Sequence, residues 1–495
     1  MGTSSIVAVL AVAPLLPLIG LLFLKLSLRS VGRALQIKGE DRRNAIVSRV
    51  RRDRDAVRES QIAQDVNEDG WETVEKAAGT AENGKAMQHD WDGVVGFFHP
   101  FCNAGGGGER VLWAAIAATQ TRWPNAICAV YTGDHDIDRS VVSLGSLILA
   151  YDAFQLLVPD LFIDTMGYAF AVALCKLLFP WVPTAAYVHY PTISTDMLDS
   201  LDDTTGQRGI HSGAGAGWKG RGKRLYWHAF AWLYGWVGGH VDVVMCNSTW
   251  TQGHIKKLWS TKRKSKSFAA IVYPPCPVEE LEEKIEVTQE SEKRRENIVL
   301  YIAQFRPEKN HSLILRAFAK FYHKAPATDK PKLVLIGSVR SNTPDEKHIY
   351  NLRLEARELK ITDATVFICD APFSVILEYL QKSSISTNGM YSEHFGIGNV
   401  EGLAAGLIPV VHNSGGPKLD IVVPYQGKEI GFHAEADEDF AAAFARVAAL
   451  DREERLAMRL RCRASTSRFT EEVFARKWAE EMETLIKMTS AKAKV

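Results

Sequence analysis

The chain has 495 residues, of which 46% are apolar and 24% are charged, and its formal net charge is +1. This is the composition of a folded protein that is too long for one core, so we expect two folded domains. The balanced charge argues against a nucleic-acid-binding protein that relies on overall positive charge. Seven scattered cysteines without a CxxC pair argue against disulfides or a zinc site and favour a reducing compartment.

The N-terminal segment Ile6 to Leu24 holds 19 residues without a charge, which predicts a short transmembrane helix. Basic residues follow this segment and none precedes it, so the positive-inside rule places the bulk of the chain in the cytosol. A buried helix or an uncleaved signal remnant is the alternative. From Lys25 to Arg58 there are eleven Lys/Arg against four Asp/Glu. This stretch is expected to lie on an anionic leaflet or to form a solvated linker helix, and residues 60–88 a flexible connector.

Folded structure is expected from Trp91 onward. A buried strand at 93–99 is followed by a glycine-rich loop, Asn103 to Gly108, and by an amphipathic helix, Glu109 to Gln120. Further strands are predicted at Ala126–Tyr131, Leu161–Asp164, Ala185–His189, Val241–Cys246 and Ile271–Tyr273. Apolar helical stretches separate several of these strands, which indicates a parallel sheet with helices on both faces.

Two segments of this first domain are candidates for membrane contact. Leu225 to Met245 combines aromatic residues with an upstream basic run, which suits a helix in the membrane interface. Its aromatic and basic residues are Trp227, Phe230, Trp232, Tyr234 and Trp236, after Lys219, Arg221, Lys223 and Arg224. A core helix of the first domain is the alternative. Tyr168 to Trp181 is the second candidate.

A charged connector, Glu279 to Glu296, interrupts the alternation, which then restarts. The predicted strands are Ile298–Ala303, Lys332–Gly337, Val366–Ile368, Ile385–Thr387 and Ile408–Val411, and the predicted helices are Ser312–Tyr322, Glu346–Leu359 and Pro372–Lys382. A helical region from Glu435 to Met488 follows. The pattern predicts an α/β protein with two doubly wound, Rossmann-like domains that face a ligand cleft.

Four consecutive glycines, Gly105, Gly106, Gly107 and Gly108, precede the first predicted helix. Glycine lets the backbone approach a ligand closely, and a helix N-terminus favours an anion. The run matches neither GxGxxG nor the P-loop pattern. It is therefore either a phosphate-binding loop or a flexible turn.

Arg306 and Lys309 follow the first strand of the second domain. Three residues apart at a strand-to-helix junction, they can converge on one anion such as a diphosphate. Such a pair alone is more typical of a solvated turn. The position of Glu393 and Glu401 at the same sheet edge favours the anion site.

Glu393 and Glu401 flank a glycine-bearing loop that leads into a short apolar helix. Carboxylates there either stabilise the helix start or accept hydrogen bonds from sugar or ribose hydroxyls. Gly415 and Gly416 follow the next strand and form either a plain turn or a second phosphate cradle. His189 ends a strand of the first domain, where it is either a structural residue or a substrate contact.

These motifs together resemble a known family. Arg306 with Lys309, and Glu393-x7-Glu401 before Gly402–Val410, resemble the retaining GT-B glycosyltransferases of family four. The stretches Phe97–Arg110, Tyr187–Ser194 and Ser392–Ile397 are more specific: they are similar to the dolichol-linked α-1,2-mannosyltransferases of asparagine-linked glycosylation, which use GDP-mannose. The resemblance covers about Trp91 to Trp478.

The resemblance implies a role for each site residue. Arg306 and Lys309 would hold the GDP diphosphate and stabilise it as it leaves. Glu401 would bind the ribose, and Glu393, with Phe395 and Gly396 in the same motif, would contact the donor mannose. His189 would lie by the donor sugar, and Gly105–Gly108 would border the phosphates and the acceptor. The role of His394, where the wider clan often has a small residue, stays open.

The resemblance also implies a cellular role. The enzyme would add the fourth and fifth mannoses to a diphosphodolichol oligosaccharide at the cytosolic face of the endoplasmic reticulum, with a lumenal N-terminus. Membrane lipid and other early mannosyltransferases would be its partners, and no nucleic acid or cofactor is expected. No metal site is expected either, since Asp134 to Asp136 is interpreted as a polar loop. Either front-face departure and attack or a carboxylate nucleophile fits the residue types.

Two other functions fit parts of the pattern. One is a different membrane-tethered family-four transferase that uses a UDP-sugar or a phosphatidylinositol acceptor. The other is a non-catalytic scaffold that binds a sugar nucleotide. The expected domain organisation is an anchor (1–30), a basic/acidic linker (31–90), a membrane-facing acceptor domain (91–278), a connector (279–296), a GDP-mannose-binding domain (297–460) and a helical tail (461–495).

Overall fold

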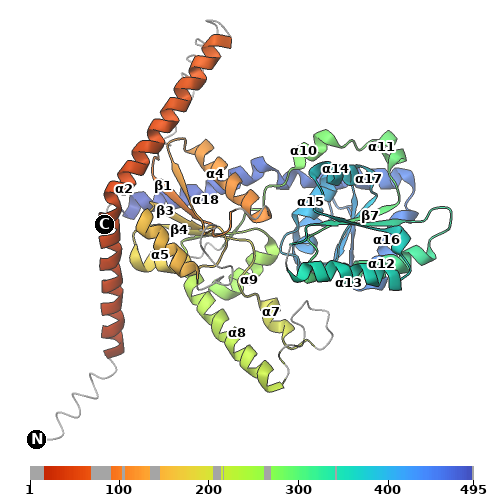
Figure 1. The fold of residues 1–495 in the computed structure, drawn as a ribbon, viewed down its shortest axis with the longest axis horizontal. Coiled ribbons are helices and arrows are strands. Elements are labelled where there is room, and N and C mark those ends of the chain that lie inside the picture. Colours follow the sequence, from red (N-terminus) through yellow and green to blue (C-terminus); the bar gives the residue numbers. More distant parts are fainter. Residues whose placement is uncertain are drawn as a thin grey trace, which may run out of the picture. The chain divides into compact units, whose positions relative to one another are not determined.

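The computed structural model describes residues 16–68, 91–102, 106–133, 145–203, 213, 215, 217–260, 269–340 and 343–492. The chain divides into two compact units, coloured along the sequence in Figure 1. The first unit comprises residues 1–187, 236–244 and 478–495, and the second comprises residues 188–235 and 245–477.

The first sheet has six parallel strands in the order β2-β1-β3-β4-β5-β6. Strands β1, β3 and β4 are buried along their whole length, as expected for a parallel sheet that is covered on both faces. The strands are β1 (Val94–Phe98), β2 (Ile127–Tyr131), β3 (Leu161–Asp164), β4 (Thr184–Val188), β5 (Val243–Cys246) and β6 (Ala270–Ile271). The accompanying helices are α4 (Gly107–Arg122), α5 (Ser146–Leu156), α6 (Phe170–Leu178), α7 (Thr195–Ser200), α8 (Gly217–Gly238) and α9 (Thr249–Trp259).

The second sheet also has six parallel strands, in the order β12-β11-β10-β7-β8-β9. The strands are β7 (Ile298–Ile302), β8 (Lys332–Gly337), β9 (Thr365–Cys369), β10 (Ile385–Asn388), β11 (Ile408–His412) and β12 (Phe432–Ala434). The helices are α12 (His311–Lys324), α13 (Pro344–Glu358), α14 (Phe373–Lys382), α15 (Ile397–Ala404), α16 (Asp437–Ala449) and α17 (Arg452–Ser465). Figure 1 shows α14 and α17 on one side of β7 and α12, α13 and α16 on the other. The predicted arrangement of two parallel sheets with covering helices is confirmed.

The predicted connector between the domains is packed on the second unit. It forms α10 (Val278–Lys284) and α11 (Gln289–Arg294). Leu281 and Ile285 are buried in the core of the second sheet, and the Glu292 carboxylate is buried beside Arg459, with 2.7 Å between Oε2 and Nε. The segment is therefore an ordered part of the second unit, although its composition is highly charged.

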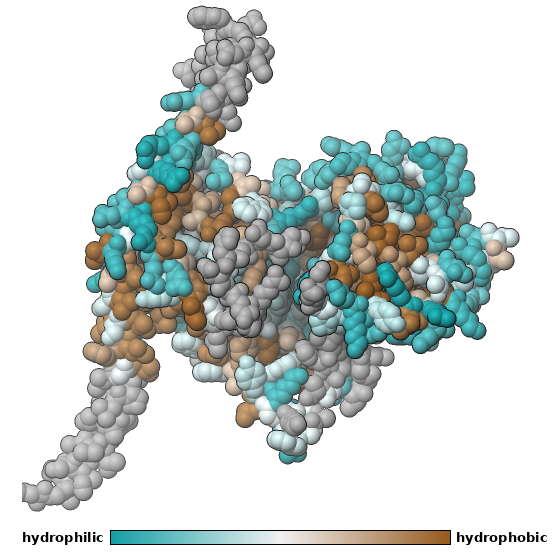
Figure 2. Space-filling model, viewed as in Figure 1, coloured by the Kyte–Doolittle hydropathy of each residue, from teal (hydrophilic) through white to brown (hydrophobic). Residues whose placement is uncertain are grey.

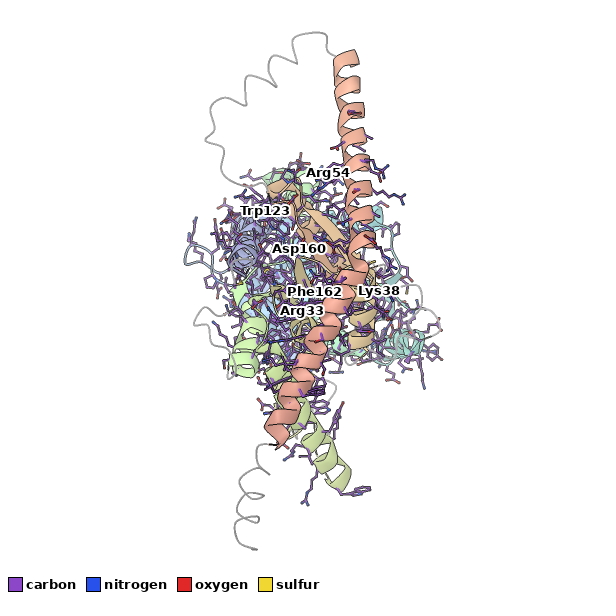
Figure 3. The ribbon with its side chains drawn as sticks, turned by 90° about the vertical axis from the view of Figure 1, so that its left-hand side faces the viewer. Arg33, Lys38, Arg54, Trp123, Asp160 and Phe162 are labelled. Carbon is purple, nitrogen blue, oxygen red and sulfur yellow. The ribbon has the colours of Figure 1, made fainter. Side chains whose placement is uncertain are left out.

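The basic N-terminal stretch forms one long helix, α2 (Leu16–Glu68), that packs on the first unit. Arg43 donates to the Val158 carbonyl and pairs with Asp160 at 2.6 Å, and Arg51 pairs with Asp92 at 2.6 Å. A Cβ at Gly32 would lie 2.0 Å from the Leu178 carbonyl oxygen on α6. Figure 3 shows α2 passing in front of the sheet that carries Asp160 and Phe162. Part of this basic stretch is thus held by protein contacts.

The described part of α2 begins with exposed apolar side chains. Leu21, Leu22 and Phe23 are 64%, 58% and 73% exposed, and Figure 2 shows the corresponding brown surface. Within the part of the chain that the structure describes, no helix has both the length and the apolar character needed to cross a bilayer. Residues 6–15 of the predicted span Ile6–Leu24 lie outside the described residues, so the span stays a prediction.

The C-terminal helix α18 (Glu471–Lys492) belongs to the first unit from Trp478 onward. The Trp478 ring is fully buried and stacks on Phe97 of β1 at 6.2 Å. Its Nε1 donates to Thr119 Oγ1 of α4 at 2.9 Å. The predicted helical tail is therefore a component of the first core.

Candidate functional site

Lys309 and Glu393 meet at the carboxyl ends of two neighbouring parallel strands. β7 leads into the short 3-10 turn Pro307–Lys309, and β10 leads into the loop that carries Glu393. Because β7 and β10 are paired, their ends lie at the same sheet edge, where open α/β sheets bind ligands. Lys309 Nζ lies 2.6 Å from Glu393 Oε2. The structure therefore brings these two predicted residues into direct contact.

The surroundings of this pair keep the Glu393 carboxylate charged. Burial raises the pKa of Glu393, but the charge of Lys309, the neighbouring His394 and hydrogen bonds from Lys309 and Asn388 outweigh it and hold the pKa below its usual value. Tyr301 donates its hydroxyl to the Lys309 carbonyl at 2.6 Å and so fixes the turn. The result is a preformed ion pair with an anionic and a cationic group side by side.

Arg306 lies at the start of the same turn but does not join the pair. Its side chain makes no hydrogen bond or ion pair among the described residues. Its charge acts on Asp345, whose pKa is lowered first by a hydrogen bond from Arg340 and to a smaller extent by Arg306. The guanidinium of Arg306 is thus held near an acidic residue but keeps its own donors for another group.

The Gly415-Gly416 turn packs against the backbone of the Glu393 loop. Gly415 has φ +67, and a Cβ there would lie 2.3 Å from the Glu393 carbonyl oxygen. The Gly416 N–H donates to that same oxygen at 2.7 Å. Ser414 Oγ accepts from the Ser392 N–H at 2.7 Å. These glycines hold the loop in place, and the Gly416 N–H is occupied in this structure.

Phe395, Gly396 and Glu401 have different environments. The Phe395 ring is 3% exposed and packs in the core on Tyr273 and Phe469. Gly396 has φ +103 and precedes the first residue of α15, a conformation that favours glycine. Glu401 is half-buried on the same helix. Phe395 therefore has a core position, while Glu401 is partly accessible at the sheet edge.

His394 is enclosed by two aromatic rings of the same unit. It stacks on Tyr190 at 4.9 Å and on Trp250 at 5.2 Å, with interplanar angles of 17° and 26°. Burial lowers the pKa of His394 to about 4, although Glu393 opposes the shift. The ring is therefore neutral near pH 7. Its neighbours Tyr190 and Trp250 were not predicted as site residues, because no spacing in the sequence connects them with position 394.

The remaining predicted site residues lie after β4 and at the start of α4. His189 directly follows β4, is half-buried, and accepts a hydrogen bond from Thr251 Oγ1 at its carbonyl at 3.4 Å. Gly106, Gly107 and Gly108 open α4 in the first unit, and the Gly106 N–H donates to Glu109 Oε2 at 2.7 Å. Gly105 lies outside the described residues. Glu109 thus occupies one of the N–H groups expected to face a phosphate.

No candidate metal cluster occurs among the residues that the structure describes: no group of three His, Cys, Asp or Glu residues is arranged to hold an ion. Asp134 to Asp136 lies outside the described ranges.

Comparisons with known proteins show the family of the chain. The family described as ALG11 mannosyltransferase N-terminus matches residues 92–143 and 140–259, and the family described as glycosyl transferases group 1 matches residues 282–464. Two relatives named GDP-Man:Man(3)GlcNAc(2)-PP-Dol alpha-1,2-mannosyltransferase are similar to the chain. The one from Neurospora crassa is 49% identical over 97% of this chain and 96% of its own length. The one from Homo sapiens is 39% identical over 83% of this chain and 90% of its own length.

Solved structures show the fold. Sucrose-phosphate synthase from Thermosynechococcus elongatus has a TM-score of 0.60 at 14% identity, over 80% of this chain and 99% of its own. Anabaena HepE in complex with UDP and glucose has a TM-score of 0.54 at 13% identity, over 79% of this chain and 99% of its own. The predicted GT-B architecture of two Rossmann-like domains is thereby confirmed.

Proposed function

The chain belongs to the family of GDP-Man:Man(3)GlcNAc(2)-PP-Dol α-1,2-mannosyltransferases, and from this premise we propose how its residues perform the transfer. The family resemblance seen in the sequence is confirmed, and the protein is a retaining glycosyltransferase. The donor is GDP-mannose and the acceptor is the diphosphodolichol-linked oligosaccharide that the relatives' names specify. The proposal assigns to this chain the addition of the fourth and the fifth mannose.

The observation that carries the mechanism is the preformed Lys309–Glu393 pair, with 2.6 Å between Nζ and Oε2. Cleavage of the bond from mannose to GDP leaves negative charge on the diphosphate and positive charge on the sugar ring. Lys309 shares its ammonium with the departing diphosphate, and Arg306 adds its unused guanidinium donors. Since Lys309 is already paired with Glu393, little reorganisation of that group accompanies the transition state.

Glu393 stays ionised next to Lys309 and accepts hydrogen bonds from the hydroxyls of the donor mannose. Its ion pair with Lys309 reduces its nucleophilicity, which favours front-face departure and attack over a covalent glycosyl-enzyme. Glu401 binds the ribose hydroxyls, and His189 contacts the donor sugar. The glycine loop Gly105–Gly108 borders the phosphates and the acceptor.

The site of action follows from the lipid acceptor. We propose that the segment Ile6–Leu24 anchors the chain in the endoplasmic reticulum membrane, with the N-terminus lumenal and both units cytosolic. The four consecutive apolar side chains Leu21–Leu24 near the start of α2 are exposed, and this supports the anchor. Contact of such a patch with water is unfavourable, whereas contact with lipid is favourable. Association with other early mannosyltransferases belongs to the same proposal.

Helix α8 supplies a second membrane contact. The exposed residues Trp218, Leu225, Trp232 and Trp236 are spaced by seven, seven and four, so they share one helical face. The helix Gly217–Gly238 contains no acidic residue and four basic ones. Tryptophan and basic side chains together favour the headgroup region of a bilayer. We therefore assign this face to lipid rather than to a protein partner.

The test is transfer by the detergent-solubilised protein from GDP-mannose to a short-chain lipid-linked trimannosyl acceptor. A mass gain of two hexoses is expected, and the same gain in EDTA supports a metal-independent reaction. Gain only with a UDP-sugar would favour a different family-four transferase, and nucleotide binding without transfer would favour a scaffold.

Two variants connect the activity with the site. Lys309→Ala and Glu393→Ala are each expected to lower transfer at least about 100-fold, as for removal of a preorganised electrostatic group. Lys320→Ala is the matched control, because Lys320 is a surface lysine of α12 that also pairs with a carboxylate, Asp437 of α16. Wild-type turnover in either site variant would remove that residue from the mechanism.

A further inference from the structure

A cluster of polar and aromatic residues surrounds the Glu393 loop without belonging to the proposed chemistry. His394 lies between the Tyr190 and Trp250 rings, at centroid distances of 4.9 Å and 5.2 Å. The Tyr190 and Trp250 rings are each nearly parallel to the His394 ring, with interplanar angles of 17° and 26°. The three rings therefore form a stack within the second unit. This stack holds the residue that directly follows Glu393.

The residue that precedes Glu393 is held by a carboxylate. Asp196 Oδ2 accepts from Ser392 Oγ at 3.3 Å and from Trp250 Nε1 at 3.1 Å, and His254 Nε2 lies 3.4 Å from the same oxygen. One oxygen of Asp196 thus contacts both Ser392, which precedes Glu393, and the Trp250 ring, which stacks on His394 after Glu393. Thr195 Oγ1 contacts His254 Nδ1 at 2.7 Å and fixes the orientation of that ring.

The backbone of the loop needs such support. Ser392 has φ +53, a left-handed conformation that a non-glycine residue keeps only when its surroundings hold it. The contacts with Asp196, Tyr190 and Trp250 provide side-chain restraints on both neighbours of Glu393. Between these two restrained neighbours, the Glu393 carboxylate lies 2.6 Å from Lys309 Nζ.

We propose that Asp196, Trp250 and His394 form a positioning cluster that holds Glu393 against Lys309 for the transfer reaction. This inference rests on the role of Glu393 and Lys309 in the proposed function. The cluster touches neither the donor nor the acceptor in this assignment, and it acts through the geometry of the loop. It also gives a role to His394, as a flat neutral ring that fills the space between two other rings.

Ring shape rather than imidazole chemistry is what the cluster requires of His394. His394→Ala removes the ring and is expected to lower kcat roughly 100-fold, since a displacement of about 1 Å at a reacting group has that effect. His394→Phe keeps a flat ring and is expected to restore kcat to within about fivefold of wild type. The KM for GDP-mannose and the affinity for GDP are expected to change less than about threefold in both variants.

Trp250 tests the other side of the stack. Trp250→Ala is expected to match His394→Ala, whereas Trp250→Phe retains a ring, loses the Asp196 hydrogen bond and is expected to fall between Ala and wild type. His323→Ala is the matched control, because His323 also contacts a tyrosine ring, Tyr322 at 5.5 Å, but lies on the exposed face of α12. It should have wild-type kcat.

The outcomes separate the two proposals. Wild-type kcat in His394→Ala and Trp250→Ala, with Glu393→Ala inactive, would overturn the positioning cluster alone. His394→Phe as inactive as His394→Ala, with a wild-type melting temperature, would also overturn it, because the imidazole itself would then be required. Wild-type kcat in Glu393→Ala would instead overturn the proposed function. If His394→Ala does not fold, the Trp250→Phe and His394→Phe variants decide, since each keeps a ring in place.

Discussion

Gly415 lies so close to the Glu393 peptide that a side chain has no room. Gly415→Ala would place a Cβ 2.3 Å from the Glu393 carbonyl oxygen at φ +67, whereas Gly427 has a similar φ of +76 with nothing within 4 Å. Both substitutions carry the left-handed backbone cost of about 1 kcal/mol. Only Gly415→Ala displaces the Glu393 loop, so we expect its transfer rate to fall about 100-fold while Gly427→Ala retains activity. Equal rates in the two variants would contradict a support role for Gly415.

His311, which is buried, and His394, which is half-buried between two aromatic rings, predict how stability depends on pH. Burial lowers the pKa of His394 to about 4 and that of His311 to about 3, from an ordinary value of 6.5. Between pH 6.5 and pH 4 the unfolded chain therefore binds protons that the folded chain does not, and stability falls as the pH is lowered. For His394 this loss amounts to about 3 kcal/mol over that range.

The measurement is the urea midpoint of the second unit's unfolding transition at pH 7, 5.5 and 4.5. His394→Phe should lose less stability than wild type across this range, because its share of the proton uptake is gone. His323→Phe, on the surface, should follow wild type. A wild-type pH slope in His394→Phe would show that His394 does not contribute.

At the residue scale, the sequence predicted the members of the ion pair but not the residues that hold them. Lys309 and Glu393 each follow a strand of one predicted sheet, so their convergence followed from topology. Asp196 contacts Ser392 across 196 positions of sequence, and no local period connects the two. The core position of Phe395 was also missed, because a motif shows which residues occur together and not which way a side chain points.

At the element scale, three arginines bind the C-terminal carbonyls of α15, the helix that carries Glu401. Arg463 donates to the Ala404 carbonyl at 2.9 Å, Arg295 to Ala405 at 2.6 Å and Arg459 to Gly406 at 2.9 Å. These donors satisfy carbonyls that a helix end leaves unpaired, and their charge matches the helix dipole. The end of the helix is thereby fixed to α17 and to the connector.

Arg459 is the most buried member of this group and the one whose loss should matter most. Its side chain and that of Glu292 are 0% and 2% exposed. Arg459→Met leaves the Glu292 carboxylate buried with only Arg455 as a partner, at an expected loss of about 3–5 kcal/mol in unfolding free energy. Arg294→Met removes an exposed pair with Glu286 and should change stability by less than about 1 kcal/mol.

A double variant separates the unpaired charge from the lost packing. Arg459→Met combined with Glu292→Leu should be more stable than Arg459→Met alone, because no carboxylate remains buried without its partner. Urea unfolding of all four proteins measures this. A double variant that is less stable than the single one would assign the effect to packing.

The connector shows why the burial of a charged segment is hard to predict from sequence. Residues 279–296 have many charges and few apolar residues, which predicts a connector between the domains. Leu281 and Ile285 nevertheless pack in the core of the second sheet, and Glu292 is buried because Arg455 and Arg459 of α17 neutralise it. The pairing partners lie far along the chain, so the charge pattern alone does not show that Glu292 is buried.

At the scale of the whole molecule, the apolar face of α8 predicts a difference between two acceptors. Trp218→Asn with Trp232→Asn removes two side chains that are 80% and 67% exposed, so folding should be unaffected. For a full-length dolichol acceptor in bilayers we expect the KM to rise about tenfold or more, since the buried area of each ring is worth over 1 kcal/mol. A short-chain acceptor in detergent should react normally.

A matched control is available on the second unit. Tyr350→Asn removes an aromatic side chain of α13 that is 61% exposed and should leave both reactions unchanged. A rise in KM for both acceptors in the tryptophan variant would place α8 at the substrate site, and no rise for either would remove it from the membrane contact.

The two sheets and their order of strands and helices were predictable because each strand is a short apolar run and each helix has its own period. The place of α18 was not, since Trp478 Nε1 contacts Thr119 across 359 positions. The partners of the N-terminal helix were also not predictable: Arg43 and Arg51 pair with Asp160 and Asp92, and no local pattern connects these positions.

Helix α2 continues without a break from the exposed Leu21–Leu24 run to the Arg43 and Arg51 contacts. At 1.5 Å per residue, about 29 Å of helix separates Leu24 from Arg43. A rigid rod of this length transmits rotation as well as distance, so any surface that grips Leu21–Leu24 also sets the tilt of α5 and α6. Anchoring of Leu21–Leu24 would therefore fix both the distance and the rotation of the first unit. Inserting or deleting a few residues of α2 between Leu24 and Arg43 would then rotate the first unit about the helix axis.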